Sequence, residues 1–182
     1  MIKFDKRFLQ RLRVPLGFLF AIIFIVFARP TVLSLLIGGG IALIGLAIRA
    51  WASGHIRKAK RLAVSGPYAY TRNPLYVGSF ILGVGFTFAA GVWWLALIFS
   101  GLFLGIYWPV MRVEAQDMHR IFGKDFEQYE QNVPLFVPRL TVWKNTRDKF
   151  NFQLYLQYRE YRAAIGAVVA IAALAAKACL LS

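Results

Sequence analysis

Cysteine, histidine and acidic side chains are scarce in this sequence of 182 residues, which has one cysteine, two histidines and eight Asp or Glu residues. The single cysteine, Cys179, excludes an intrachain disulfide, because a disulfide needs two thiols. So few histidine and cysteine ligands argue against a metal centre. No serine or cysteine stands in a pattern with histidine and aspartate that indicates a nucleophilic pair. No small-residue cleavage site follows the apolar run that begins at Val14, so we expect no removable signal peptide.

Apolar and basic residues, in contrast, are abundant. Hydrophobic residues make up 59% of the chain, above the roughly 45–50% of ordinary soluble domains. The formal net charge is +14, which in a soluble protein would indicate nucleic acid binding. Here the basic residues gather at the ends of apolar runs, so we expect anionic lipid headgroups as partners and no nucleic acid. The length suits one integral membrane domain.

The apolar runs predict an all-α, polytopic membrane helical bundle of about five transmembrane helices. The predicted spans are residues 14–28, 31–51, 74–90, 92–111 and 163–181. The first run would reach only about 22 Å at the helical rise of 1.5 Å per residue, so it must borrow from its flanks or thin the bilayer. Amphipathic or interfacial helices are expected at residues 1–13, 112–132 and 141–162.

Small residues recur inside two of these spans. The triplet Gly38-Gly39-Gly40 lies in the second span, and Gly78 and Gly85 lie in the third. Such residues let two helices approach closely. Close packing is the favoured reading of the triplet, and a functional unwinding of the helix is the alternative.

The positions of the basic residues predict the orientation in the membrane. Of the 22 Lys and Arg residues, all except Arg29 and Lys177 lie in residues 1–13, 49–72 and 112–162. The positive-inside rule places these three segments, including the N-terminus, on the cytoplasmic side. Two separate charged segments are then available to build one cytoplasmic site.

Residues 65–78 form a polar, proline-containing stretch that leads into the third span. We expect Asn73 to cap the helix and Pro74 to take its first position, where a missing N–H costs nothing. Arg72 would then lie at the mouth of an apolar helix, where it suits a polar or anionic ligand. The same mouth carries three tyrosines, Tyr68, Tyr70 and Tyr76.

Glu114 stands on the apolar stripe of the expected helix 112–132. A carboxylate there is costly unless something binds it, which favours a ligand role over the alternative of an ion pair with Arg112 or Arg72. His55 alone would be an interfacial anchor, and Lys58 and its basic neighbours would be headgroup contacts.

The sequence resembles the isoprenylcysteine carboxyl methyltransferase and phospholipid methyltransferase family of integral membrane enzymes. The resemblance covers about residues 45–140, whereas residues 1–44 and the tail carry little of it. The matching residues are Gly66-Pro67-Tyr68, Arg72-Asn73-Pro74-Leu75-Tyr76 with Gly78, Glu114, Phe122-Gly123, Phe126, Tyr129, Val133, Pro134 and Pro138.

The resemblance implies a helical methyltransferase that binds S-adenosylmethionine without a Rossmann domain. Residues 45–140 would form the cofactor-binding core, residues 1–44 the N-terminal spans, and residues 141–182 an interfacial helix with the last span. The implied cofactor-binding residues are His55, Lys58, Leu62, Ala63, Tyr68, Arg72, Asn73, Pro74, Leu75, Tyr76 and Glu114. Two positions depart from the family pattern, because Asn73 stands where a histidine is frequent and Ala115 where a second glutamate is common.

The chemistry of the cofactor suits these residue types independently. Arg72 can hold its carboxylate bidentately, and Glu114 can accept hydrogen bonds from the ribose. Tyr68 or Tyr76 can face the sulfonium. We therefore expect Arg72, Tyr76 and Glu114 to be the catalytic residues.

The predicted function is methyl transfer from S-adenosylmethionine to a carboxyl or thiol group of an isoprenylcysteine-like or other lipophilic acceptor, leaving S-adenosylhomocysteine. Arg112 would contact the acceptor's polar end. A carboxylate or thiolate acceptor needs no general base, whereas an amine would need one. Phospholipid N-methylation is the first alternative, and a non-catalytic scaffold or small transporter is the second. A transporter should carry a charge in mid-membrane, and the predicted spans have none away from their ends.

Overall fold

The computed structural model describes residues 6–56, 61–144 and 148–181, with side chains described from Pro15 to Leu180 within these ranges. The described part of the chain is helical and contains no strand. Its elements are α1 (Lys6–Phe27), α2 (Val32–Ser53), the 3-10 helix η1 (Gly66–Ala69), α3 (Pro74–Ala89), α4 (Trp93–Phe122), α5 (Lys124–Asn132), α6 (Phe152–Gln157) and α7 (Tyr161–Leu181). The predicted helical bundle is confirmed.

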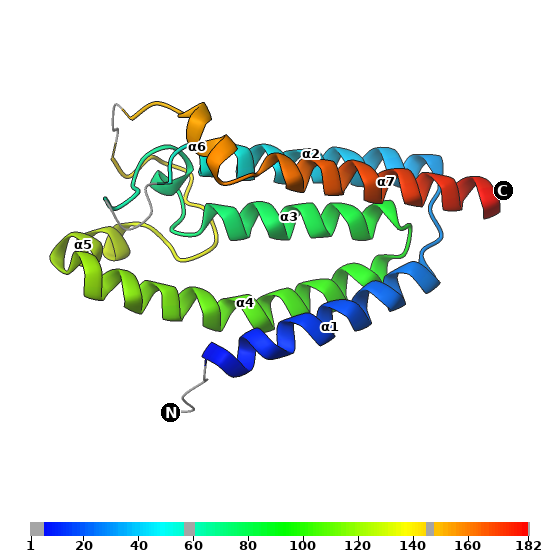
Figure 1. The fold of residues 1–182 in the computed structure, drawn as a ribbon, viewed down its shortest axis with the longest axis horizontal. Helices are drawn as coiled ribbons and strands as arrows, with labels where there is room; N and C mark the ends of the chain where they lie inside the picture. Colours follow the sequence, from blue (N-terminus) through cyan, green and yellow to red (C-terminus); the bar gives the residue numbers. More distant parts are fainter. Residues whose placement is uncertain (1–5, 57–60, 145–147, 182) are drawn as a thin grey trace.

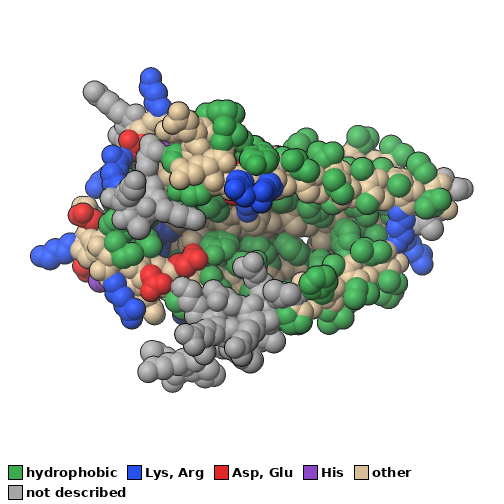
Figure 2. All heavy atoms as spheres, viewed as in Figure 1, with side chains coloured by type: hydrophobic (Ala, Val, Ile, Leu, Met, Phe, Trp, Pro, Cys, Tyr) green, Lys and Arg blue, Asp and Glu red, His purple; other side chains and the backbone are tan. Residues whose placement is uncertain are grey.

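The long helices run alternately in opposite directions along one axis (Figure 1). As a result, the end of α2, the start of α3, the end of α4 and the start of α7 meet at one end of the bundle, together with η1, α5 and α6. The C-terminus lies at the other end. Charged side chains gather mainly at the first end, and apolar side chains cover much of the visible surface beyond it (Figure 2). We call the first end the charged end.

Three helices are long and apolar enough to cross a membrane, at Val32–Ser53, Trp93–Phe122 and Tyr161–Leu180. Two further predicted spans appear as shorter apolar helices, Pro15–Phe27 and Pro74–Ala89. Large apolar side chains are exposed along the outer helices, as expected for contact with lipid. They include Phe18, Ile22, Ile25, Val32, Leu36, Leu43, Ile165 and Val168. The chain is therefore an integral membrane protein, and the number of its helices that cross the bilayer stays a prediction.

Glycine allows α2 and α3 to pack closely. A Cβ atom built on Gly38 would lie 2.2 Å from the backbone nitrogen of Ala89, and one built on Gly85 would lie 2.5 Å from that of Ala42. In contrast, a Cβ on Gly39 would meet nothing within 4 Å. Because α2 is helical throughout the triplet, the helix is not unwound. The packing interpretation is confirmed for Gly38, whereas Gly39 and Gly40 face open space.

Helix boundaries differ from the sequence prediction at three places. The expected interfacial helix at 1–13 and the first span are not separate, because α1 runs without a break from Lys6 to Phe27, with Pro15 inside it. The fourth span and the expected helix 112–132 are not separate, because α4 continues without a break from Trp93 to Phe122. The break comes at Gly123, whose φ of 51° and ψ of −123° suit glycine. The expected interfacial helix at 141–162 is also wrong in extent, because within the described residues 141–144 and 148–160 only Phe152–Gln157 is helical, and α7 begins at Tyr161.

Candidate functional site

A cavity of about 630 Å³ lies at the charged end of the bundle. Its walls come from α2, the segment between α2 and α3, the start of α3, the end of α4, and α5. The lining residues are Arg49, Ile56, Arg61, Leu62, Ala63, Tyr68, Arg72, Asn73, Pro74, Leu75, Tyr76, Ser79, Met111, Glu114, Ala115, Asp117, Met118, Phe122, Phe126, Tyr129 and Leu135. Most of them are apolar or aromatic, with a few charged groups between them.

Hydrogen bonds hold the two distant segments of the site together. The hydroxyl of Tyr129 on α5 donates to the carbonyl of Tyr68 over 2.7 Å. Three backbone hydrogen bonds join the same segments. The N–H of Arg72 donates to the carbonyl of Pro134 over 2.9 Å, that of Arg139 to the carbonyl of Tyr70 over 2.9 Å, and that of Trp143 to the carbonyl of Ala69 over 3.2 Å. The segment that follows α5 is therefore fixed against the stretch that precedes α3.

Asn73 does not cap α3 with its side chain, which corrects the expectation from sequence. It occupies the N-cap position, and Pro74 takes the first helical position as predicted, but the Asn73 side chain makes no capping bond. Instead its amide donates to the carbonyl of Leu135 over 2.9 Å. The Asn73 amide therefore fixes the segment that follows α5 and not the end of α3.

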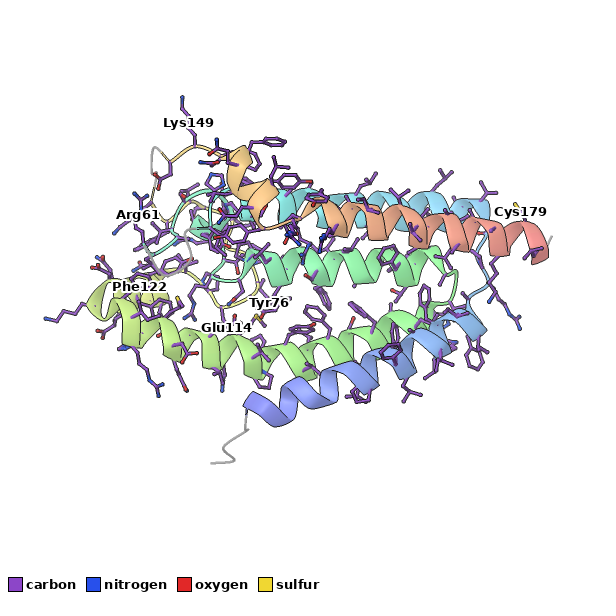
Figure 3. The ribbon with its side chains drawn as sticks, viewed as in Figure 1. Arg61, Tyr76, Glu114, Phe122, Lys149 and Cys179 are labelled. Carbon is purple, nitrogen blue, oxygen red and sulfur yellow. The ribbon has the colours of Figure 1, made fainter. Side chains whose placement is uncertain are left out.

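Tyr76 and Glu114 join α3 to α4 across the cavity. The Tyr76 hydroxyl donates to Oε1 of Glu114 over 3.0 Å. Figure 3 shows the two side chains facing one another from the two helices. The Tyr76 ring also packs on Tyr107, with centroids 5.2 Å apart. A carboxylate on an otherwise apolar helix face is thus held in a defined orientation inside the cavity.

Arg72 is the cation at the mouth of α3. Its side chain is only 11% exposed, and it forms an ion pair with Glu130 of α5 through Nη1. Its Cζ lies 5.9 Å from the centre of the Phe126 ring. Nε of Arg72 is buried and has no hydrogen-bond partner among the described residues. A buried donor of this kind is costly, so the guanidinium is suited to a further acceptor.

The phenols of Tyr68 and Tyr129 both stay protonated. Burial raises the pKa of Tyr68, and the nearby Tyr158, Glu160 and Glu114 add to the effect. Burial likewise raises the pKa of Tyr129, which Tyr68 raises further and Arg72 opposes. Both hydroxyls therefore remain hydrogen-bond donors at any ordinary pH.

The cavity brings together most of the residues predicted to bind the cofactor. Nine of them line it: Leu62, Ala63, Tyr68, Arg72, Asn73, Pro74, Leu75, Tyr76 and Glu114. His55 lies outside the lining, buried beneath Gly66, with Nδ1 3.0 Å from the carbonyl of Trp51. Lys58 lies outside the described residues. Arg112 is exposed on α4 and is not part of the lining.

A partly buried ion pair at the cavity wall was not predicted from the sequence. Arg49 on α2 binds both carboxylate oxygens of Glu160, at 2.8 and 3.0 Å through Nη2, and also contacts the Ser79 hydroxyl on α3. The signal in the sequence is that Arg49 stands near the end of an apolar span, which is consistent with a partly buried side chain. Its partner comes from the junction of α6 and α7, 111 residues away, which no local spacing could predict.

No group of three or more His, Cys, Asp or Glu side chains that could hold a metal ion occurs in the part of the chain that the structure describes.

The curated proteins include three relatives with partial similarity to this chain. The nickel-cobalt-cadmium resistance protein NccN of Alcaligenes xylosoxydans is 34% identical over 53% of this chain and 46% of its own length. The cobalt-zinc-cadmium resistance protein CzcN of Cupriavidus metallidurans is 33% identical over 63% of this chain and 53% of its own. The protein-S-isoprenylcysteine O-methyltransferase of Schizosaccharomyces pombe is 34% identical over 46% of this chain and 38% of its own. The chain thus matches about half or less of the length of these relatives.

No solved structure matches the chain. The model of the phospholipid methyltransferase family matches residues 31–125, which is more than half of the sequence and includes α2, α3, α4 and the cavity residues from Arg49 to Phe122. The chain belongs to the phospholipid methyltransferase family.

Proposed function

We propose that this protein transfers a methyl group from S-adenosylmethionine to a lipophilic acceptor and leaves S-adenosylhomocysteine. The observation that carries the proposal is that Arg72, Tyr76 and Glu114, from segments far apart in sequence, line one cavity at the charged end of a membrane bundle. The family and the isoprenylcysteine methyltransferase relative support methyl transfer.

The groups in the cavity fit the polar parts of this cofactor. The buried Nε of Arg72, which lacks a partner among the described residues, suits the carboxylate of the amino-acid part. The carboxylate of Glu114, oriented by Tyr76, suits the two ribose hydroxyls, since each oxygen accepts more than one hydrogen bond. The rings of Tyr68 and Tyr76 suit a sulfonium.

The remaining proposed residues complete the enclosure. Leu62, Ala63, Asn73, Pro74 and Leu75 lie in the cavity wall and would contact the cofactor. His55 would act from beneath Gly66, as part of the wall's support. When bound, the cofactor supplies an activated methyl group, and the chain binds, orients and shields the reacting groups. In favourable systems such positioning is worth about 7–11 kcal/mol of the barrier.

An apolar wall favours an acceptor with a hydrocarbon part. A carboxylate or thiolate acceptor reacts without a general base, whereas an amine would need one. Since none of the proposed site residues is assigned that role, a carboxylate or thiolate acceptor is favoured. Arg112 would hold the polar end of such an acceptor, reaching it from the exposed face of α4. The family's description favours one alternative, in which the acceptor is the amine of a phospholipid.

Transfer of isotopically labelled methyl groups tests this proposal. The purified protein is incubated with labelled S-adenosylmethionine and a total lipid extract, and the products are identified by mass spectrometry. We expect labelled lipid with the wild type and at least a tenfold lower rate, about 1.4 kcal/mol or more of transition-state stabilisation, with Glu114→Gln. Label released by mild base identifies a methyl ester, whereas base-stable label identifies methylation of nitrogen or sulfur. A wild type that labels no lipid contradicts the proposal and favours a non-catalytic scaffold.

A further inference from the structure

The ion pair between Arg72 and Glu130 joins two residues in very different surroundings. The Arg72 side chain is 11% exposed and lines the cavity, whereas the Glu130 side chain is 43% exposed and is not part of the lining. Glu130 contacts Nη1 of the guanidinium. Nε on the same guanidinium stays without a hydrogen-bond partner among the described residues.

A guanidinium presents its donors as a planar fork, and a carboxylate fits that fork with two parallel hydrogen bonds. Glu130 does not satisfy Nε of this fork. A second carboxylate that reaches Nε would satisfy the buried donor that Glu130 leaves unpaired. The exposed partner loses little on leaving, since solvent screens a surface carboxylate.

We infer that Glu130 competes with a ligand carboxylate for Arg72, because two carboxylates on one guanidinium repel each other, so that this residue lowers the affinity of the cavity for carboxylate-bearing ligands. The inference rests on the proposed function, in which the ligand is the amino-acid part of S-adenosylmethionine. Glu130 is then released toward solvent when the cofactor binds.

The position of Glu130 makes this release simple. It lies on α5, a helix of nine residues that follows the break at Gly123. Phe126 and Tyr129 on the same helix are buried and stay packed against the site, while the Glu130 side chain points from the exposed face. A change of its side-chain rotamer therefore frees Arg72 without moving α5.

Binding of two probes to the full-length protein tests the inference. S-adenosylhomocysteine carries the carboxylate, and 5′-methylthioadenosine has the same nucleoside and a thioether but no amino-acid part. We expect Glu130→Gln and Glu130→Ala to lower the Kd for S-adenosylhomocysteine by about two- to fivefold, the range for loss of an exposed competing charge. The Kd for 5′-methylthioadenosine should not change.

Glu127→Gln is the matched control, because Glu127 is an exposed carboxylate on the same helix, one turn earlier. It removes the same charge and should leave both affinities as in the wild type. In an Arg72→Ala background, Glu130→Gln should lose its effect, since the two residues act through one guanidinium.

Three results overturn the inference. They are weaker or unchanged binding of S-adenosylhomocysteine by the Glu130 variants, an equal gain for both probes, and an equal gain with Glu127→Gln. A wild type that binds neither probe is a different outcome, because it overturns the proposed function as well.

Discussion

At the scale of single residues, one hydroxyl links the two halves of the candidate site. Tyr76 on α3 donates to Glu114 on α4, and both line the cavity. We expect Tyr76→Phe to weaken binding of S-adenosylhomocysteine by about two- to tenfold, because a lost hydrogen bond of this kind is worth roughly 0.5–1.5 kcal/mol. Isothermal titration of the purified protein measures the change.

Tyr155→Phe is the control for this prediction, because Tyr155 on α6 also carries a phenol but lies outside the cavity lining. It should bind like the wild type. Equal affinities for Tyr76→Phe and the wild type would show that the hydroxyl does not orient Glu114 for binding.

The buried phenols of Tyr68 and Tyr129 predict a loss of stability at high pH. Their pKa values are raised by burial in the folded chain, whereas an exposed tyrosine titrates near pH 10. The stabilisation is therefore complete below about pH 10 and is lost as the pH rises above that value, where the unfolded chain loses the protons first.

Thermal unfolding in detergent at several alkaline pH values measures this loss. The double variant Tyr68→Phe, Tyr129→Phe should start from a lower midpoint, because the bond from Tyr129 to the Tyr68 carbonyl is gone, and should then fall less steeply with pH. If the unfolding midpoints of both proteins fall equally steeply with pH, other groups, such as lysines, cause the loss of stability at alkaline pH.

At the scale of elements, two adjacent glycines of α2 should behave differently. A Cβ on Gly38 would lie 2.2 Å from the backbone of α3, whereas a Cβ on Gly39 would meet nothing within 4 Å. We expect Gly38→Ala to destabilise the protein by about 1–3 kcal/mol, the usual cost of overpacking. Gly39→Ala should be neutral or stabilising by up to about 1 kcal/mol, because alanine favours helix over glycine.

Reversible unfolding in mixed micelles measures both free energies. If the two variants have the same stability, close approach of α2 and α3 does not explain the small residues in these spans.

The break between α4 and α5 depends on the backbone conformation of Gly123. With φ at 51° and ψ at −123°, an alanine there would be strained by about 1–3 kcal/mol even though space is available. Since α5 carries Phe126 and Tyr129 into the cavity wall, Gly123→Ala should weaken ligand binding as well as stability. Gly105→Ala, in the regular part of α4, is the control, and a similar loss in both would contradict the special role of Gly123.

At the scale of the whole molecule, we predict that the charged end faces the cytoplasm. In a chain with Cys179→Ser, a cysteine at Gln128 on α5 should react with a membrane-impermeant maleimide only after cells are permeabilised. A cysteine at Arg29, in the turn between α1 and α2 at the opposite end, should react in intact cells. The reverse pattern would place the candidate site outside the cell.

Much of the arrangement was predictable from sequence because charge and hydropathy act over whole segments. The distribution of Lys and Arg placed residues 49–72 and 112–162 at one end of the bundle, and the structure brings Arg72 and Glu114 from these segments to one cavity. The small residues of α2 and α3 likewise predicted their close packing. Both predictions succeed because charge and residue size can be read directly from the local composition of a segment.

The parts that escaped prediction depend on partners distant in sequence. The sequence predicts that Asn73 caps α3, but in the folded chain its side-chain amide donates to the carbonyl of Leu135 instead. Nothing in the sequence distinguishes Glu160 and Glu130 from surface charges, yet they pair with Arg49 and Arg72. No spacing rule connects such residues, because the fold alone brings them together.

The central claim is that two separate segments at the charged end hold one molecule of S-adenosylmethionine, and titration with S-adenosylhomocysteine tests it most directly. The full-length protein in lipid nanodiscs should bind one equivalent. Arg72→Lys, which loses the guanidinium fork, and Glu114→Gln, which loses the carboxylate, should each bind at least about tenfold more weakly. Lys124→Gln, a change of an exposed cation on α5, should bind like the wild type. A wild type that gives no binding signal, or an Arg72 or Glu114 variant that binds as tightly as the wild type, would contradict the account.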